Sequence, residues 1–285
     1  MRIARFSADS EVRYGVVDSP GAGANDQAGN GEAGNGQAGN GQAGERLSVA
    51  EIGGHPFGQG EADVKLTGTR YLVDDVRLLA PVLPSKVVAI GRNYAEHARE
   101  LGNEPPAEPL IFLKPSTAVI GPGDPIVRPA RLSKRVDFEG ELAVVFGRLC
   151  RDVPAARVPE VIFGYTCAND VTARDLQASD GQWARAKGFD TFCPLGPWIE
   201  TSLDAGDVEL TTTVNGEVKQ QARTSLLMHD IVSLVCYVTA VMTMLPGDVL
   251  LTGTPAGIGP LVAGDSVAVH IEGIGTLTNP VVDPE

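Results

Sequence analysis

Short apolar runs separated by turn residues dominate the chain, and this pattern predicts strands more often than helices. Strands are expected at 84–91 (PSKVVAIG), 110–113, 118–120, 139–146, 248–252 and 265–271. The alternating runs 208–214 and 217–221 flank Asn215-Gly216, a strong signal for a tight β-hairpin. The central and C-terminal parts of the chain are therefore expected to be rich in antiparallel sheet.

Helical spacing occurs in only two places. The segment 91–102 (GRNYAEHARELG) has helical periodicity and ends at a glycine, and a second helix is expected from about residue 230 to 244, before Pro246-Gly247. No strand–helix–strand period repeats along the chain. The pattern predicts a mixed α+β fold that is predominantly β, and disfavours a doubly wound sheet or a barrel of eight βα units.

The N-terminal residues 1–80 are expected to form a small β-rich domain, with residues 81–285 as the catalytic domain. Strand-like pieces at 1–17 and 46–52 flank a repetitive segment, 21–45, in which the unit A-G-N-G-Q/E recurs. This segment has no large apolar residue to offset its ordering entropy, so a flexible insertion in a long hairpin loop is favoured over a recognition tail.

Composition narrows the classes of function. The chain has 285 residues, 43% of them hydrophobic, and a net charge of −13 with a pI near 4.8. Such an acidic protein is expected to bind neither nucleic acid nor an anionic membrane, although a local cation can still attract a small anionic substrate. The longest apolar run, 231–245, is shorter than the ~20 residues that span a bilayer, and the N-terminus has no apolar signal segment. A cytoplasmic location is expected.

The sequence also lacks the motifs of disulfide-rich proteins, zinc sites and nucleotide-binding sites. The four cysteines form no C-x-x-C pair, which favours reduced thiols over disulfides or a zinc site. No phosphate-binding glycine loop or dinucleotide fingerprint is found.

Two acidic residues at the start of a predicted strand are the first candidates for chemistry. Glu139 and Glu141 stand at i and i+2, which places both carboxylates on one face of a strand. Two like charges beside an apolar strand are costly unless a hard divalent cation such as Mg²⁺, Mn²⁺ or Ca²⁺ neutralises them. The alternative is a solvated strand edge with two ordinary surface glutamates.

A second polar cluster follows the apolar segment that begins at Tyr165. Asp170 closes that segment, and there it can supply a third carboxylate to a facial set of metal ligands that leaves positions open for water and a chelating substrate. Arg174 and Asp175, which follow in the same cluster, can instead form an ordinary ion pair on the surface.

One histidine and one lysine also have partners that suggest chemistry. His97 and Glu100 are i and i+3 on one helix face, so the carboxylate can orient the imidazole as a base; spacing alone favours an ordinary surface pair. Lys187 is either a basic helix end or a site residue whose pKa a nearby cation and burial would lower. The remaining histidines, His55, His229 and His270, have no such pattern.

Several motifs in order resemble the fumarylacetoacetate hydrolase family, from about Val87 to the C-terminus. They are Gly91-Arg92-Asn93-Tyr94 with His97, 112–115 (FLKP), 138–142 (FEGEL), 169–175 (NDVTARD), 186–190 (AKGFD), 246–248 (PGD) and 252–255 (TGTP). Within the family, the resemblance is to acylpyruvate hydrolases, oxaloacetate decarboxylases and 2-hydroxyhepta-2,4-diene-1,7-dioate isomerases. It implies a β-roll or β-sandwich catalytic domain with a small N-terminal domain, a homodimer, and a role in the breakdown of aromatic compounds.

The resemblance also implies roles for individual residues. Its metal ligands correspond to Glu139, Glu141 and Asp170, with Mg²⁺ or Mn²⁺ as the expected ion and Ca²⁺ as a further candidate. Its other site positions correspond to the dyad of His97 and Glu100 on a lid, the active-site Lys187, Gln177 near the reacting oxygen, Thr254 beside the substrate carboxylate, and Arg92 and Tyr94 at the pocket mouth. Gly140, where relatives often have a larger residue, is expected to face away from the metal, with no loss of activity.

The expected reaction is metal-dependent hydrolysis of a C–C bond in an acylpyruvate-type 2-oxo acid, through an enolate stabilised by the cation. Oxaloacetate decarboxylation or isomerisation of 2-hydroxyhepta-2,4-diene-1,7-dioate on the same site is the alternative, because all three reactions share that enolate. Phosphoryl hydrolysis is a remote alternative, as is a non-catalytic protein that binds a metal or a 2-oxo acid.

Overall fold

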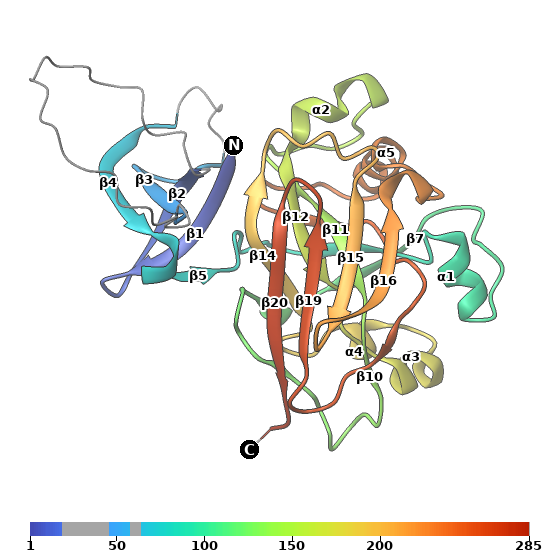
Figure 1. The fold of residues 1–285 in the computed structure, drawn as a ribbon. Helices are drawn as coiled ribbons and strands as arrows, with labels where there is room; N and C mark the ends of the chain where they lie inside the picture. The colour runs from blue at the N-terminus through green and yellow to red at the C-terminus, as the bar shows by residue number, and fades with distance from the viewer. Residues whose placement is uncertain (19–45, 58–63, 285) are drawn as a thin grey trace, which may run out of the picture.

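The computed structural model describes residues 1–18, 46–57 and 64–284, and it is mostly β, as expected. Figure 1 shows a group of N-terminal strands beside a larger body built from two layers of sheet. The predicted repeat insertion at 21–45 lies outside the described residues.

The N-terminal strands form an antiparallel meander. Its members are β1 (Arg2–Ala8), β2 (Glu11–Asp18), β3 (Ser48–Ile52), β4 (Leu66–Leu72) and β5 (Arg77–Leu79). The strand-like piece predicted at 1–17 is thus two strands, joined by Asp9-Ser10 with both residues at positive φ. Because β2 and β3 pair directly, with Gly15 opposite Glu51, the repeat segment joins two strands of one hairpin. β1 also pairs with β14, which connects this meander to the main sheet.

The main sheet continues in the order β14-β12-β11-β17-β6-β7. These strands are β6 (Val87–Gly91), β7 (Leu110–Lys114), β11 (Gly140–Phe146), β12 (Ile162–Asn169), β14 (Cys193–Glu200) and β17 (Val249–Leu251). β8 (Val119–Ile120) pairs with β14. A small sheet beside the site comprises β13 (Thr172–Ala173), β10 (Val136–Phe138) and β18 (Gly259–Pro260).

A second sheet packs against β11, β12 and β14. In order it comprises β16 (Glu217–Arg223), β15 (Glu209–Val214), β19 (Ser266–Ile271), β20 (Gly275–Val282) and β9 (Ile126–Val127). The hairpin predicted at Asn215-Gly216 joins β15 to β16, with both turn residues at positive φ. Figure 1 shows this sheet in front of the main one, and Leu142, Leu210 and Leu277 are among the buried side chains of their shared core.

Helices are short and lie at the margins of the sheets. They are α1 (Ala95–Glu100), α2 (Val158–Val161), α3 (Arg174–Asp180), α4 (Ala184–Lys187) and α5 (Ile231–Val241), with 3₁₀ turns at Val73–Asp75, Ser116–Ala118, Ala155–Arg157 and Thr224–Leu226. α5 starts where predicted, because the Asp230 carboxylate accepts a hydrogen bond from the Ser233 N–H at 2.7 Å. It ends at Val241, earlier than predicted, and α1 is also shorter than its pattern indicated.

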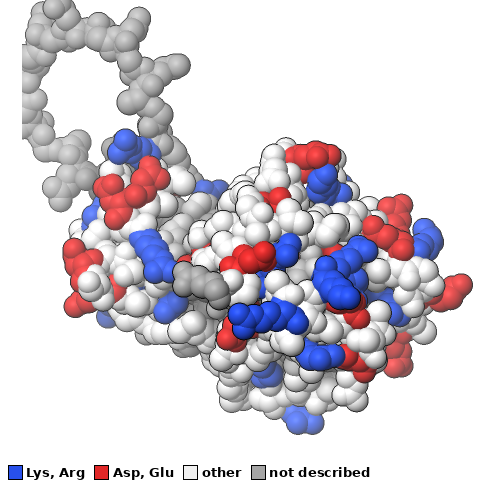
Figure 2. Space-filling view, turned by 90° about the horizontal axis from the view of Figure 1, so that it is seen from below, with Lys and Arg blue, Asp and Glu red and all other residues white. Residues whose placement is uncertain are grey.

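Other global expectations can be compared with the structure. Among the described residues, no helix is long and apolar enough to cross a membrane. All four cysteines are free thiols, and Cys150, Cys167 and Cys193 are buried. Figure 2 shows one face of the molecule, on which basic and acidic side chains are interspersed.

Gly140 has a packing role that its sequence context does not reveal. A Cβ at this position would face away from the neighbouring carboxylates and lie 2.0 Å from Thr212 Oγ1 on β15. The Gly140 N–H also donates to Gln220 Oε1 at 2.9 Å. Glycine is therefore needed because the second sheet packs directly on the backbone between the two glutamates.

We expect Gly140→Ala to lower the free energy of unfolding by about 1–3 kcal/mol, the usual cost of overpacking a core. Chemical denaturation measures this cost. In a Thr212→Ala background the same substitution should cost at least ~1 kcal/mol less, because the clashing hydroxyl is gone. Strict additivity of the two substitutions would contradict the proposed contact.

Candidate active site

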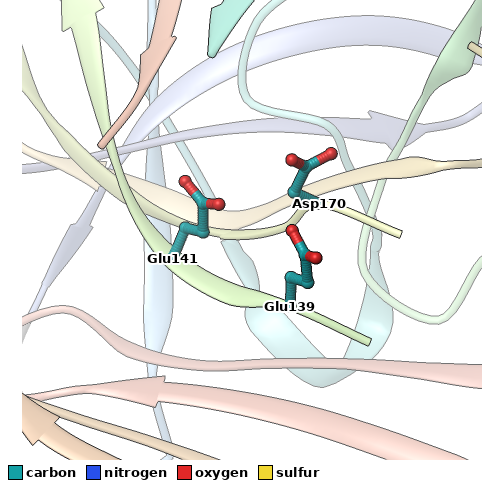
Figure 3. Close-up of side chains that lie close together, drawn as sticks. All are labelled: Glu139, Glu141 and Asp170. Atoms are coloured by element: carbon teal, nitrogen blue, oxygen red, sulfur yellow. The ribbon is translucent and has the colours of Figure 1, made fainter. Parts of the chain in front are cut away.

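Three buried carboxylates converge where the neighbouring strands β11 and β12 of the main sheet begin and end, respectively. Ligand oxygens of Glu139, Glu141 and Asp170 all lie within 4.8 Å of one another. Figure 3 shows their carboxylate groups gathered around a shared space. Glu139 immediately precedes β11, Glu141 is its second residue, and Asp170 immediately follows β12. Each residue is at most 3% exposed, so the alternative of two solvated surface glutamates is wrong.

Strand register produces this convergence. In the antiparallel β11–β12 pair, Gly140 lies opposite Asn169, which places Asp170 beside Glu139. The Asp170 N–H donates to the Glu139 carbonyl at 2.8 Å, and the Glu139 N–H donates to Asn169 Oδ1 at 2.9 Å. Alternation along the strand then brings Glu141 to the same face.

The backbone of a turn holds the third carboxylate. The Gly253 N–H donates to Glu141 Oε2 at 2.6 Å. Gly253 has a φ of 108°, and a Cβ there would lie 2.7 Å from the Asn93 side chain. The Thr-Gly-Thr-Pro motif therefore needs glycine at this position, so that the turn can approach both Glu141 and Asn93.

Two buried lysines compensate the negative charge. Lys187 Nζ lies 2.7 Å from Glu139 Oε2 and 2.6 Å from Asp170 Oδ2, so it bridges two members of the triad. Lys114 Nζ lies 2.6 Å from the other oxygen of Asp170 and 3.2 Å from the Val171 carbonyl. Both ammonium groups are almost completely shielded from solvent. Lys114 is a site residue for which the motif pattern predicts no role.

The ion pairs determine the protonation of the site. Burial alone would raise the pKa of Glu139, but Lys187 and Arg174 outweigh it and hold that pKa well below its ordinary value. Burial alone would lower the pKa of Lys187, whereas Asp170 and Glu139 raise it above the ordinary value. Without a cation the carboxylates thus outweigh burial, and the lowered lysine pKa expected beside a bound cation stays a prediction. Lys187 is a charged partner of the carboxylates.

Glu141 behaves differently from its neighbours. Burial, together with the nearby charges of Asp170 and Glu139, raises its pKa well above the ordinary value. The proton-bearing form of Glu141 is thus favoured until a cation compensates the charge. A divalent cation bound here would have to displace that proton.

Arg174 organises one side of the site. It donates to Asp137 Oδ2 through Nε at 2.9 Å, to Gln177 Oε1 through Nη1 at 2.6 Å, and to Glu139 Oε1 through Nη2. Asp175 instead accepts from Ser133 Oγ and the Lys134 N–H. The alternative of an Arg174–Asp175 surface pair is therefore wrong: Arg174 links a buried aspartate, Gln177 and a triad carboxylate.

The predicted dyad is present on α1. His97 Nδ1 lies 3.2 Å from Glu100 Oε2, and Glu100 Oε1 accepts a hydrogen bond from the Gly257 N–H at 3.1 Å. His97 is 3% exposed and lines the same cavity as the triad, unlike a histidine in an ordinary surface pair. Because Nδ1 faces the carboxylate, Nε2 is the nitrogen left to accept a proton.

The remaining predicted site residues divide into two groups. The triad cavity is lined, among others, by Arg92, His97, Gln177, Lys187 and Thr254. Tyr94 is buried but does not line it; Tyr94 lines a separate cavity on the other side of α1. The Thr254 hydroxyl donates to the Gly140 carbonyl at 2.9 Å and accepts from Gln220 Nε2 at 2.8 Å, so it also supports the backbone between the glutamates.

The donor set suits a hard divalent cation. Three carboxylates offer oxygen ligands on one side only, the arrangement that leaves positions for substrate. The Lys187 ammonium already lies between two of them, which shows that this space attracts positive charge. The site can therefore bind a metal and hold an imidazole base beside it.

Comparison with known families assigns both parts of the chain. The family model described as "Fumarylacetoacetate (FAA) hydrolase C-terminal" matches residues 86–282, and one described as "Rv2993c-like, N-terminal" matches residues 1–81. The first match includes all three carboxylates, both lysines and the dyad.

Proteins similar to this chain include one named as a tautomerase and one named as an isomerase. Protein Rv2993c of Mycobacterium tuberculosis is 60% identical over 239 residues, covering 83% of this chain and 88% of that protein. The mitochondrial oxaloacetate tautomerase Fahd2a of Rattus norvegicus is 42% identical over 219 residues, 73% of this chain and 70% of that protein. The crystal structure of 5-carboxymethyl-2-hydroxymuconate delta-isomerase from Mycobacterium smegmatis is 51% identical and covers 100% of both chains with a TM-score of 0.84.

Proposed function

Because the chain belongs to the fumarylacetoacetate hydrolase family, we propose that it is a metal-dependent enzyme that transfers protons on a small 2-oxo dicarboxylic acid. The reaction proposed first is tautomerisation or isomerisation, which moves a proton to or from the carbon beside the keto group. The observation that carries this proposal is a buried imidazole base lining the same cavity as the three carboxylates.

Each part of the site has a distinct task. Glu139, Glu141 and Asp170 would hold Mg²⁺ or Mn²⁺, which when bound stabilises negative charge on the 2-oxo oxygen of the substrate as a Lewis acid. His97 Nε2 accepts and returns the proton, while Glu100 fixes the ring through Nδ1 and stabilises its charged form. The hydrogen bond from the Gly257 N–H holds Glu100 in turn.

The names of two similar proteins support this ordering of reactions. An isomerase at 51% identity and a tautomerase at 42% identity both catalyse rearrangements that need no attacking water. C–C bond hydrolysis of an acylpyruvate is the second candidate, since the same His97–Glu100 pair can deprotonate water. Proton transfer comes first because, unlike hydrolysis, it needs no water molecule positioned to attack the substrate.

An assay on two substrates tests the proposal. We expect the purified protein with Mg²⁺ or Mn²⁺ to accelerate the enol-to-keto conversion of oxaloacetate, followed by ultraviolet absorbance, and excess chelator to abolish the effect. Pyruvate release from acetylpyruvate, measured in parallel, reports hydrolysis, and pyruvate release from oxaloacetate reports decarboxylation. Acetylpyruvate cleavage without tautomerisation would reverse the order of the two candidates. No metal-dependent reaction of either substrate would refute the proposal.

We also propose a domain boundary near residue 80 and assembly as a homodimer. The separate family matches to residues 1–81 and 86–282 support the boundary. Analytical ultracentrifugation tests the dimer, and a sedimentation coefficient matching 29.8 kDa would contradict it.

A further inference from the structure

The edge strand β16 of the second sheet buries an amide side chain and exposes an apolar one. Gln220 is 1% exposed, whereas Val218 is 55% exposed. In the pairing with β15, Thr213 lies opposite Val218 and Thr212 lies opposite Gln220, so Lys219 is the extra residue of a β-bulge. Bulges re-aim side chains and are frequent next to active sites. This bulge points Gln220 into the protein.

The Gln220 side chain joins two segments of the candidate site. Its Oε1 accepts a hydrogen bond from the Gly140 N–H at 2.9 Å, and its Nε2 donates to Thr254 Oγ1 and to the Pro255 carbonyl, both at 2.8 Å. The Gly140 N–H can only donate and the Pro255 carbonyl can only accept, so the orientation of the amide group is fixed. Both amide hydrogens are used within the protein, and Gln220 is therefore suited to hold the site rather than to bind a ligand.

The turn that Gln220 holds supports both halves of the site. The Gly253 N–H donates to Glu141 Oε2 at 2.6 Å, and the Gly257 N–H donates to Glu100 Oε1 at 3.1 Å. One short segment thus supplies a backbone donor to a carboxylate of the triad and another to the acid of the dyad. Gln220 binds this segment between the two donors.

The bulge also contacts the end of the turn that supports the dyad. Gly257 has a φ of 99°, and a Cβ at this position would lie 2.1 Å from the Lys219 carbonyl oxygen. The turn therefore needs glycine here, because the backbone of β16 lies directly against it. The bulge backbone and the Gln220 side chain hold the same turn in two places.

We infer that Gln220 is a positioning residue that couples the metal ligands to the dyad. It acts through the Gly140 backbone, between the two glutamates, and through the turn that holds Glu141 and Glu100. Groups that orient metal ligands from behind commonly contribute about 10–100-fold to metal affinity. The effect on the dyad rests on the proposed function, whereas the effects on the turn and on the metal ligands can be measured without turnover.

The test combines amide hydrogen exchange with metal binding. Gln220→Met keeps the length of the side chain and removes all three hydrogen bonds. In the Mg²⁺-loaded protein, we expect the Gly253 and Gly257 amides to exchange about tenfold faster, measured by NMR, with the amides of β19 unchanged. Mn²⁺ affinity should fall ~10-fold. The matched control is Gln221→Met, on the exposed next residue, whose amide donates only to Glu209 at 3.1 Å; it should behave as wild type.

A second variant separates the two ends of the Gln220 side chain and serves if Gln220→Met does not fold. Gln220→Glu can still accept from the Gly140 N–H, but a carboxyl group cannot donate to both Thr254 and Pro255. We expect the Gly140 amide to keep its protection from exchange while the two turn amides exchange faster. Loss of protection at Gly140 alone would contradict the assigned contacts.

The remaining outcomes separate this inference from the proposed function. At saturating Mn²⁺, kcat for oxaloacetate should fall about tenfold in Gln220→Met, because the dyad is no longer held in place. Unchanged Mn²⁺ affinity, unchanged kcat in an active enzyme, or exchange that is faster throughout the protein would reduce Gln220 to a merely structural residue and overturn the inference. If the turn amides and Mn²⁺ affinity change as expected but the wild type converts neither oxaloacetate nor acetylpyruvate, the positioning of the metal ligands stands and the proposed function fails.

Discussion

Replacing Glu141 by glutamine should weaken Mn²⁺ binding by more than about 100-fold, because even substitutions behind a metal ligand cost ~10–100-fold. We expect kcat/KM for the metal-dependent reaction to fall by about 1000-fold, equivalent to about 4 kcal/mol of lost transition-state stabilisation. The amide oxygen of glutamine can still accept the hydrogen bond from Gly253. The uncharged amide group of glutamine also resembles the protonated carboxyl group that burial favours at this position.

The metal-free protein should therefore keep its stability in this variant. Its melting temperature is expected within a few degrees of wild type, measured by differential scanning calorimetry in chelator. Glu217→Gln, on an exposed side chain of β16, is the matched control and should change neither Mn²⁺ affinity nor rate. Undiminished Mn²⁺ affinity in Glu141→Gln would remove Glu141 from the ligand set.

The pH dependence of metal binding should follow from the same carboxyl. The pKa of Glu141 is raised in the metal-free protein, so a proton leaves when the cation binds. Mn²⁺ affinity should then rise with pH above the ordinary glutamate range, and Glu141→Gln should flatten that rise.

The local parts of the site can be predicted from sequence because they depend on strand alternation. Glu139 and Glu141 are two positions apart, so any strand through them presents both carboxylates on one face. Burial of the pair cannot be deduced in the same way, because it depends on the sheet that covers β11 from elsewhere in the chain. The contact between Gly140 and Thr212 is the clearest case, since only the packed structure shows why that position is glycine.

The parts of the site that the sequence does not predict are contacts between segments far apart along the chain. Lys114 contacts Asp170 from β7. The sequence marks this lysine as the end of an otherwise apolar strand and as part of the Phe-Leu-Lys-Pro motif, but neither feature predicts its partner. Glu100 is held by the backbone of Gly257, on a loop 157 residues further along the chain. Local periodicity in the sequence cannot predict a contact between residues so far apart along the chain.

β14 and β20 are among the strands absent from the prediction, and for both the reason lies in their composition. β14 (CPLGPWIE) contains two prolines and a glycine, and β20 (GTLTNPVV) contains Pro280 near its end. Proline supplies no N–H to a ladder, so both segments have poor strand patterns. Their neighbours on both sides nevertheless pair with them, and tertiary packing overrides local propensity.

Removing the charge of Lys187 should destabilise the metal-free protein strongly. Lys187→Met leaves Glu139 and Asp170 without the buried ammonium that bridges them, and breaking a buried ion pair costs ~3–5 kcal/mol. Arg174 still contacts Glu139 and Lys114 still contacts Asp170. We therefore expect the free energy of unfolding to fall by about 3 kcal/mol, which corresponds to a fall in melting temperature of roughly 10 °C. Lys219→Met, which removes an exposed pair with Glu217, should cost less than ~1 kcal/mol.

Mn²⁺ should reverse most of this loss, because a divalent cation supplies the charge that the ammonium provided. The gain in melting temperature on adding Mn²⁺ is thus expected to be larger for Lys187→Met than for wild type, and smallest for Glu141→Gln. This opposite behaviour follows from two carboxyl environments. The pKa of Glu139 is held low beside Lys187, so Glu139 needs a cation, whereas the raised pKa of Glu141 favours a proton until the metal binds. Equal Mn²⁺ stabilisation of all three proteins would mean that the ion binds away from the carboxylates, and the site would then have to be sought elsewhere.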